Sequence, residues 1–404
     1  MKELSAMKVL ELSNAGKLMP LKVAAREVPH AVIEPNYTCN RRCAACYNRF
    51  REGVKPFEQV TEEIDRAIAL RNLETISILG GEPTLHPRLV EIVRYIKSKG
   101  LVCQILTNGL VFLRDESNCL LDKLVDAGLD RVVLHIDCGQ GLTPGEVEQM
   151  RGVLFTRLEQ RGVCFGLSVT LYTENLASVP DIMHRYARYR YFDGVLATLA
   201  RDMGRAGTDP PVMPADHELH DVHASIEQGL GVQPSSFIPS NLDDQEVRWL
   251  IYFYYVNVAT GATVPVSPRF NRCMRRGYRL LTGRHLFAVP MNPSLTRVWF
   301  LLTAVIESLL SPSQVFRHVR LALHSALLKS LRFQYIVLQS APRVDADGGP
   351  VEICYHCPDA TIRNGKLVPV CLADRISPTG EYRGSVPGDS VLADVVCAHL
   401  EEAA

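Results

Sequence analysis

The sequence lacks a long apolar run. Its longest strongly apolar stretch, residues 298–306, is about half as long as a membrane-spanning helix must be. Near the N-terminus, Glu3 and Glu11 interrupt the apolar residues, so the continuous apolar core of a secretory signal is missing. We therefore expect a protein that is made and kept in the cytoplasm.

Acidic residues are nearly absent from one part of the chain, residues 247–344. The whole sequence is neutral, with 44 basic and 44 acidic residues, but this region has twelve arginines and Lys329 against a single acid, Glu307. Its net charge is therefore +12, and it contains both tryptophans, Trp249 and Trp299. Such a region is either a helical subdomain whose arginines pair with carboxylates elsewhere or a surface for an anionic, partly apolar partner.

We expect helices in this basic region. Residues 311–340 combine a Ser-Pro start with basic and apolar residues at helical spacing, which predicts one amphipathic helix. A basic amphipathic helix is typical of a peripheral membrane contact, and an amphipathic anionic lipid or a prenyl phosphate would suit the same features. Nucleic acid is the less favoured partner. Residues 389–402 predict a second, short amphipathic helix at the tail.

Disulfides are not expected, because no export signal accompanies the twelve cysteines. Six of them fall in two tight sets, Cys39, Cys43 and Cys46, and Cys354, Cys357 and Cys371. Thiols that cluster in a reducing compartment indicate metal binding.

A strand–helix unit repeats between residues 30 and 200. Apolar, β-branched runs end about 30 residues apart, as βα units require. Right-handed crossovers make such a series a parallel sheet with helices outside, and ligands bind at the carboxyl ends of its strands. The expected fold class is α/β, a partial (β/α)6 TIM-like barrel with a helical insertion and a small C-terminal cluster-binding hairpin domain.

Composition divides the chain into five segments. They are an N-terminal extension (1–29), the core barrel (30–200), a basic, aromatic-rich helical insertion that forms the substrate region (201–349), an auxiliary cluster segment (350–376) and a C-terminal tail helix (377–404).

The first cysteine set has the spacing C-x3-C-x2-C and follows the first strand of the barrel. Three thiolates can hold three corners of a 4Fe–4S cluster and leave one iron for another ligand, whereas structural zinc prefers four protein ligands. One βα unit later, the run Gly80-Gly81-Glu82-Pro83 follows the second strand. Together these motifs resemble the radical S-adenosylmethionine (SAM) superfamily over about residues 30–200.

The resemblance implies roles for individual residues. Cys39, Cys43 and Cys46 would hold the SAM-binding 4Fe–4S cluster. Gly80, Gly81, Glu82 and Pro83 would bind the methionine end of SAM, with Glu82 or a nearby carbonyl accepting from its ammonium group. Candidates for further cofactor contacts are Asn108, Asp137, Ser168 and Thr170. The family usually has an aromatic residue before the third cysteine, where this chain has Ala45, and Tyr47 is the candidate replacement.

The resemblance also implies an enzyme whose chemistry comes from its cofactor. A reduced cluster would cleave SAM to methionine and a 5′-deoxyadenosyl radical, which abstracts hydrogen from an unactivated C–H bond. No catalytic side chain is expected beyond that radical. An electron donor such as flavodoxin or ferredoxin is an implied partner.

The second cysteine set has the spacing C-x2-C-x13-C and contains a hairpin signal, Asn364-Gly365, which turns Cys371 back toward Cys357. It resembles the twitch and SPASM-like auxiliary domains of radical SAM enzymes, which implies a second 4Fe–4S cluster. Zinc stays open as an alternative, with Cys273 or His356 as candidate fourth ligand.

Three functions remain open from the sequence. The preferred one is radical SAM chemistry on an amphipathic anionic lipid or prenyl phosphate. The second is the same chemistry on a peptide or small metabolite. The third is a non-catalytic zinc-binding protein that engages nucleic acid or a membrane.

Overall fold

The structure is a computed structural model that describes residues 7–12, 14–48, 52–200, 218–310, 315–324, 330–340, 342 and 352–375. The tail helix expected at residues 389–402 lies outside these residues. No described helix has both the length and the apolar character needed to cross a membrane.

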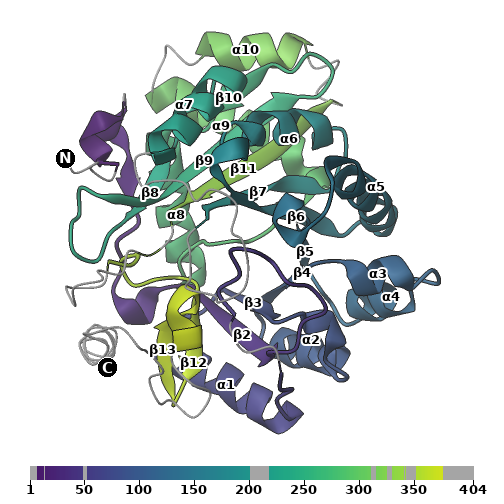
Figure 1. The fold of residues 1–404 in the computed structure, drawn as a ribbon. Helices are drawn as coiled ribbons and strands as arrows, with labels where there is room; N and C mark the ends of the chain where they lie inside the picture. The colour runs from purple at the N-terminus through teal and green to yellow at the C-terminus, as the bar shows by residue number, and fades with distance from the viewer. Residues whose placement is uncertain are drawn as a thin grey trace, which may run out of the picture.

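Six parallel strands form the core, each paired with the next in chain order (Figure 1). They are β2 (His30–Asn36), β3 (Thr75–Gly80), β4 (Val102–Thr107), β5 (Arg131–His135), β6 (Cys164–Leu171) and β7 (Phe192–Leu199). Helices lie between successive strands, so the predicted partial (β/α)6 barrel is confirmed.

Helices connect the core strands and bury apolar residues against them. These helices are α1 (Phe57–Leu70), α2 (Leu89–Ser98), α3 (Leu110–Arg114), α4 (Cys119–Asp126), α5 (Pro144–Arg161) and α6 (Ser178–Tyr186). In α1, Val60, Ile64 and Ala67 recur at helical spacing and are fully buried. The core therefore lies between the sheet and this outer layer, and the strand ends stay available for a site.

The sheet does not end at β7. Four more strands extend it in the order β7–β11–β9–β8–β1, and β10 pairs with β9. Their bounds are β11 (Leu331–Gln339), β9 (Val247–Asn257), β8 (Ser236–Pro239), β1 (Met19–Pro20) and β10 (Thr263–Pro265). Strand β11 runs parallel to β7 and antiparallel to β9. The barrel wall thus continues into the region that the sequence predicts to be helical.

The prediction for residues 311–340 is correct only in part. A helix, α10 (Val315–His324), is present, but residues 331–339 form β11. The apolar spacing that suggests a helix continues into this segment, yet pairing on both sides by β7 and β9 makes it a strand. Three further helices occupy the insertion: α7 (Glu218–Leu230), α8 (Pro268–Thr282) and α9 (Thr296–Leu310). The insertion is therefore mixed rather than helical.

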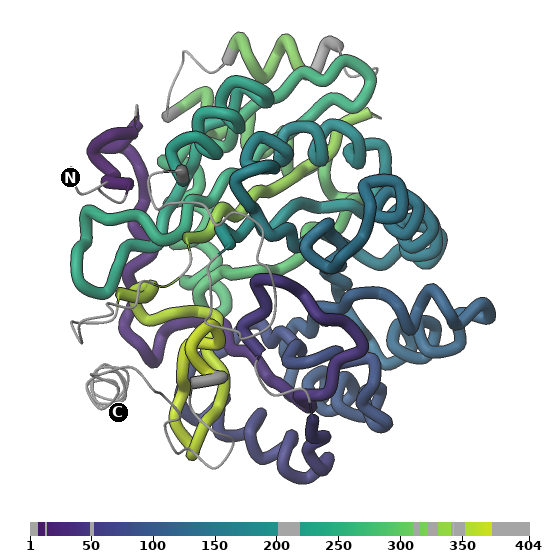
Figure 2. Tube along the Cα trace, viewed as in Figure 1, coloured from purple at the N-terminus to yellow at the C-terminus, as the bar shows by residue number. Residues whose placement is uncertain are grey.

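The C-terminal hairpin is present as predicted. Strands β12 (Ala360–Arg363) and β13 (Lys366–Pro369) pair antiparallel, and Asn364 and Gly365 both have positive φ, as a type I′ turn requires. Figure 2 shows this yellow segment beside the purple segment that contains β2, and the two are in contact. A buried ion pair between Arg363 and Glu34 fastens the hairpin to β2.

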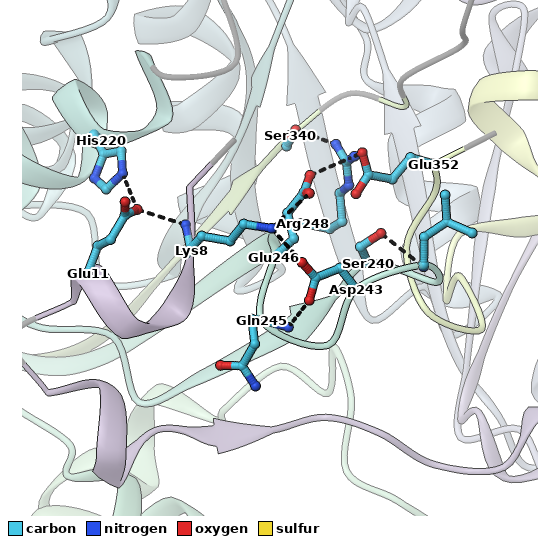
Figure 3. A network of polar contacts seen from close by, with 11 residues as sticks. Lys8, Glu11, His220, Ser240, Asp243, Gln245, Glu246, Arg248, Ser340 and Glu352 are labelled. Atoms are coloured by element: carbon cyan, nitrogen blue, oxygen red, sulfur yellow. Dashed lines mark hydrogen bonds and ion pairs between the residues drawn. The ribbon is translucent and has the colours of Figure 1, made fainter. Parts of the chain in front are cut away.

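A second buried ion pair joins the same C-terminal segment to β9 (Figure 3). The Arg248 side chain is 1% exposed and contacts the carboxylates of Glu246 and Glu352. This arginine belongs to the basic region, so at least part of the +12 charge is neutralised by carboxylates outside it, as one of the two sequence interpretations proposes.

We predict that Arg248→Met destabilises the protein strongly. The substitution removes the buried cation that contacts both the Glu246 and the Glu352 carboxylate, and removing one partner of a buried ion pair typically costs about 3–5 kcal/mol. The control is Arg279→Met, because Arg279 pairs with Glu27 at the surface, where an ion pair contributes about 0–1 kcal/mol. Denaturant unfolding measures both changes. Equal, small losses for the two variants would contradict the structural role given to Arg248.

Candidate functional site

Both cysteine sets face one cavity at the carboxyl ends of the core strands. The cavity has a volume of about 280 Å³, and its wall includes Cys39, Cys43, Cys46, Cys354, Cys357 and Cys371. Among the described residues, no three Cys, His, Asp or Glu side chains are placed as they would be around one metal ion. Because both sets line the same cavity, they belong to one site although they are more than 300 residues apart in sequence.

Backbone hydrogen bonds hold the first cysteine loop against the strand ends. The amide of Gly81 donates to the Asn36 carbonyl at 2.9 Å, and the amide of Glu82 donates to the Thr38 carbonyl at 2.8 Å. On the other side of the loop, the Ala44 amide donates to the Gly139 carbonyl at 3.0 Å. The loop is therefore fixed at both ends, and its thiols line the cavity.

The two glycines are needed because the cysteine loop passes directly over them. A Cβ on Gly81 would lie 2.1 Å from the Thr38 carbonyl oxygen, and one on Gly80 would lie 2.5 Å from that of Asn36. Gly80 also has a φ of +120°, which L side chains rarely adopt. The motif thus brings the end of β3 and the cysteine loop into backbone contact, and both glycines line the cavity.

The carboxylate of Glu82 is buried and already engaged. It accepts from the Thr84 and Asn108 amides at 3.1 and 2.8 Å and from the Thr107 hydroxyl at 2.5 Å. Burial raises its pKa, and these donors act in the opposite direction. Glu82 therefore ties β3 to the end of β4, which leaves a backbone carbonyl as the better acceptor for a ligand ammonium.

The other candidates for cofactor contact divide into two groups. Asn108, Ser168 and Thr170 line the cavity with the glycines and Glu82. Pro83 and Asp137 are not among the lining residues, and both are buried. Asp137 accepts from the Gly139 and Thr170 amides at 3.0 and 2.9 Å, so it shapes the loop that holds the cysteines.

The aromatic position before the third cysteine is occupied by a small residue, and Tyr47 lies two positions further along in the same cavity wall. Ala45 and Tyr47 both line the cavity. The Tyr47 hydroxyl donates to the Gly80 carbonyl at 3.3 Å, so this ring joins the cysteine loop to the glycine motif.

The second cysteine set is surrounded by donors. The indole N–H of Trp249 donates to the Cys354 sulfur at 3.0 Å. Contact with the Cys357 thiol lowers the pKa of Cys354, and Arg248 and Trp249 add to the effect. The same contact, together with burial, raises the pKa of Cys357. Arg71 donates to the Cys357 and Pro358 carbonyls, which anchors this loop to the core.

The two residues proposed as fourth ligand of the second set are not part of the cavity wall. Cys273 is exposed on α8 and does not line the cavity, nor does His356. Asp359, which sequence reasoning missed, does line it, and burial raises the pKa of this carboxyl to about 6. The only sequence signal for Asp359 is its position two residues after Cys357.

A larger cavity lies next to the first one, toward the amino ends of the strands. Its volume is about 470 Å³, and mostly aliphatic and aromatic side chains from the barrel, β9, β11, α8 and α9 line it. Leu79, Leu106, Trp249 and Asp359 line both cavities, so the two share a wall.

A chain of polar side chains crosses the floor of this larger cavity. Ser77 hydrogen bonds to the His30 ring at 3.0 Å and accepts from the Gln104 amide at 2.5 Å. Arg131 donates to Gln104 at 3.3 Å and to Asp193 at 2.7 Å. Burial lowers the pKa of His30 to about 3, so its imidazole is neutral. These groups hydrogen bond to one another, and most of the remaining wall is apolar.

One cationic side chain in the cavity wall lacks such a partner. Arg275 of α8 is buried and donates to the Asn271 side chain at 3.2 Å and to the Leu286 carbonyl at 2.6 Å. No carboxylate pairs with it among the described residues, in contrast to Arg131. Burial without a countercharge lowers its pKa to about 10, so it remains a cation at neutral pH.

A family model described as the Radical SAM superfamily matches residues 33–151, the segment that includes the first cysteine set and the glycine motif.

Curated relatives agree with the family match. The tungsten-containing aldehyde ferredoxin oxidoreductase cofactor-modifying protein of Pyrococcus furiosus is 29% identical over 42% of this chain and 50% of its own length. The Fe-coproporphyrin III synthase of Methanosarcina barkeri is 28% identical over 40% of this chain and 42% of its own length. The chain thus spans half or less of the length of these relatives.

Among solved structures, Streptococcus suis SuiB bound to S-adenosylmethionine is 16% identical over 50% of this chain and 47% of its own, with a TM-score of 0.40. The family model and the curated relatives support the radical SAM superfamily for this chain, a superfamily of enzymes that use a 4Fe–4S cluster and S-adenosylmethionine.

Proposed function

We propose that this protein is a radical SAM enzyme that abstracts hydrogen from an amphipathic anionic lipid or prenyl phosphate. The observation that supports the enzyme chemistry most strongly is the single cavity that Cys39, Cys43 and Cys46 share with Gly80 and Gly81. When bound there, a 4Fe–4S cluster and SAM supply a 5′-deoxyadenosyl radical, and flavodoxin or ferredoxin is the proposed electron donor.

The chain contributes position and shielding to this chemistry. The three half-buried thiols suit a cluster whose open corner faces the cavity. The glycines bring a bare backbone to the methionine end of SAM, and Glu82 holds that backbone in place through β4. Leu79 and Leu106 line both this site and the larger cavity, so a substrate in the larger cavity would lie next to the site, beside apolar side chains that exclude water.

The second cysteine set is proposed to hold an auxiliary 4Fe–4S cluster of the twitch or SPASM-like type. Cys354, Cys357 and Cys371 face the same cavity, and the hairpin fixes them through Arg363 and Glu34. Because both cysteine sets line one cavity, the auxiliary cluster would lie near enough to accept an electron from a product radical or to anchor the substrate. Either role requires it for product formation but not for the cleavage of SAM.

The larger cavity supports a substrate with an apolar body. Its wall is mostly aliphatic and aromatic, and its volume of about 470 Å³ falls in the range of ligand sites. The buried Arg275 supports an anionic group on the same molecule, because a buried cation gains most from a charged partner. A peptide or small polar metabolite would leave most of this wall without a complementary surface.

Two triple variants separate the roles of the cysteine sets. Replacing Cys39, Cys43 and Cys46 by Ala should reduce 5′-deoxyadenosine formation to the background of a protein-free reaction, because the SAM-binding cluster is lost. Replacing Cys354, Cys357 and Cys371 by Ala should preserve SAM cleavage and abolish product formation. Anaerobic assays with dithionite measure both products by mass spectrometry. SAM cleavage by the first variant would overturn the proposal.

Arg275→Met should weaken lipid-dependent turnover. Loss of a charged hydrogen bond to the substrate costs about 1.5–3 kcal/mol, so we expect KM for the lipid to rise about tenfold or more while lipid-independent SAM cleavage is unchanged. Arg276→Met is the matched control, because Arg276 is exposed on the same helix and does not line the cavity. Equal effects of the two substitutions would argue against an anionic substrate group at Arg275.

Trp249→Phe should make the reduction potential of the auxiliary cluster more negative. The indole N–H donates to the Cys354 sulfur, and such a donor stabilises the more negatively charged, reduced state. Trp299→Phe is the control, since Trp299 lines only the larger cavity. Redox titration followed by electron paramagnetic resonance measures the shift. An unchanged potential in Trp249→Phe would contradict a hydrogen bond from Trp249 to a cluster-bound Cys354 sulfur.

A further inference from the structure

Helix α9 is apolar on two opposite faces. Its inward face buries Phe300 against a small core cluster that includes Tyr255 and Leu331. Its outward face carries Val298, Leu301, Leu302, Val305 and Leu309, at the spacing of one helical stripe. A helix on the surface of a soluble domain ordinarily has polar residues on that side.

The outward stripe is well exposed. Val298 and Val305 are each 61% exposed and Leu309 is 80% exposed. Helix α10, which packs against α9, adds Phe316 at 84% exposure and Val319. A contiguous exposed apolar patch of this kind marks an interaction site rather than ordinary surface.

The surroundings of the stripe are basic. Arg297 on α9 and Arg317 and Arg320 on α10 are exposed beside the apolar residues. The single acidic residue of this region, Glu307, points inward, where it accepts from the Ser267 amide at 2.7 Å and lies 3.5 Å from the His318 ring. The partner of this face is therefore apolar in its interior and negatively charged at its surface.

The same helix forms part of the wall of the larger cavity. Trp299 and Thr303 line the cavity from the inward side of α9. Leu295, immediately before α9, lines the cavity and is also 46% exposed, so the cavity reaches the surface next to the start of the stripe. A molecule that enters at Leu295 passes from the apolar face directly into the apolar cavity.

We propose that the outward stripe of α9, together with Phe316 and Val319 of α10, docks on an anionic bilayer, and that lipid enters the larger cavity from this bilayer beside Leu295. The aliphatic side chains insert below the headgroups, and the arginines contact the phosphates. The proposed docking is inferred from the exposed residues of this face alone. The proposed passage of lipid into the cavity rests, in addition, on the proposed function. Apart from Phe316, the apolar side chains named on this face are aliphatic and offer no stacking platform, so nucleic acid fits it less well.

The test is co-sedimentation of the full, anaerobically reconstituted protein with vesicles. The vesicles contain phosphatidylcholine alone or phosphatidylcholine with phosphatidylglycerol. We expect binding to the anionic vesicles, weaker binding to the neutral ones, and loss of binding at high salt. The double variant Leu301→Glu and Val305→Glu should lower the partition coefficient about tenfold or more, because it removes two apolar side chains and adds two negative charges.

Val153→Glu is the matched control, because Val153 is also exposed on a helix, α5, outside the proposed face. Circular dichroism and thermal unfolding verify that both variants fold. A second variant, Arg297→Glu with Arg317→Glu, should reduce binding to anionic vesicles and leave binding to neutral vesicles unchanged.

Three results would overturn the docking proposal. They are no preference for anionic vesicles, equal binding by the double variant and the wild type, and a change of oligomeric state in the double variant, which would make the face a contact between copies of this chain. Vesicle binding is measured without turnover, so its failure would leave SAM cleavage and the proposed function standing. If the protein binds vesicles but lipid does not change the rate of SAM cleavage, the docking proposal stands and the proposal of a lipid substrate fails.

Discussion

Two buried ion pairs hold the C-terminal segment between strands that are distant in the sheet. Arg363 pairs with Glu34 on β2, and Arg248 on β9 pairs with Glu352. Burying these charges is costly, so each pair must remain complete for the segment to stay docked. This docking brings Cys354, Cys357 and Cys371 to the cavity of the first cysteine set and places Trp249 and Asp359 in the wall between the two cavities.

The arrangement explains why the basic region is not simply a charged surface. Arg248 neutralises carboxylates at the second cysteine set, Arg275 is buried in the wall of the larger cavity, and Arg297 and Arg317 are exposed around an apolar stripe. The arginines of the basic region therefore lie in three different environments. The interpretation of paired arginines describes Arg248, whereas an anionic partner remains a proposal for the other three arginines.

The sequence predicts the parts of the site that local patterns determine. Strand–helix periodicity gives the six core strands, the Asn364-Gly365 turn gives the hairpin, and cysteine spacing with Gly80-Gly81 gives the resemblance to the family. The structure adds a steric reason for the glycines, since the backbone of the cysteine loop lies directly over them. Contacts between distant segments were not predictable, because no local pattern signals that Trp249 reaches Cys354 or that β11 pairs with β7.

In the proposed reaction, the enzyme breaks a C–H bond of a lipid. Lipids extracted from the native host grown in deuterated medium would be supplied to the reduced enzyme with unlabelled SAM. Mass spectrometry of the 5′-deoxyadenosine measures the origin of the transferred hydrogen. We predict deuterium in 5′-deoxyadenosine with the labelled lipids and none with unlabelled lipids. Abundant 5′-deoxyadenosine that contains no deuterium would contradict a lipid substrate.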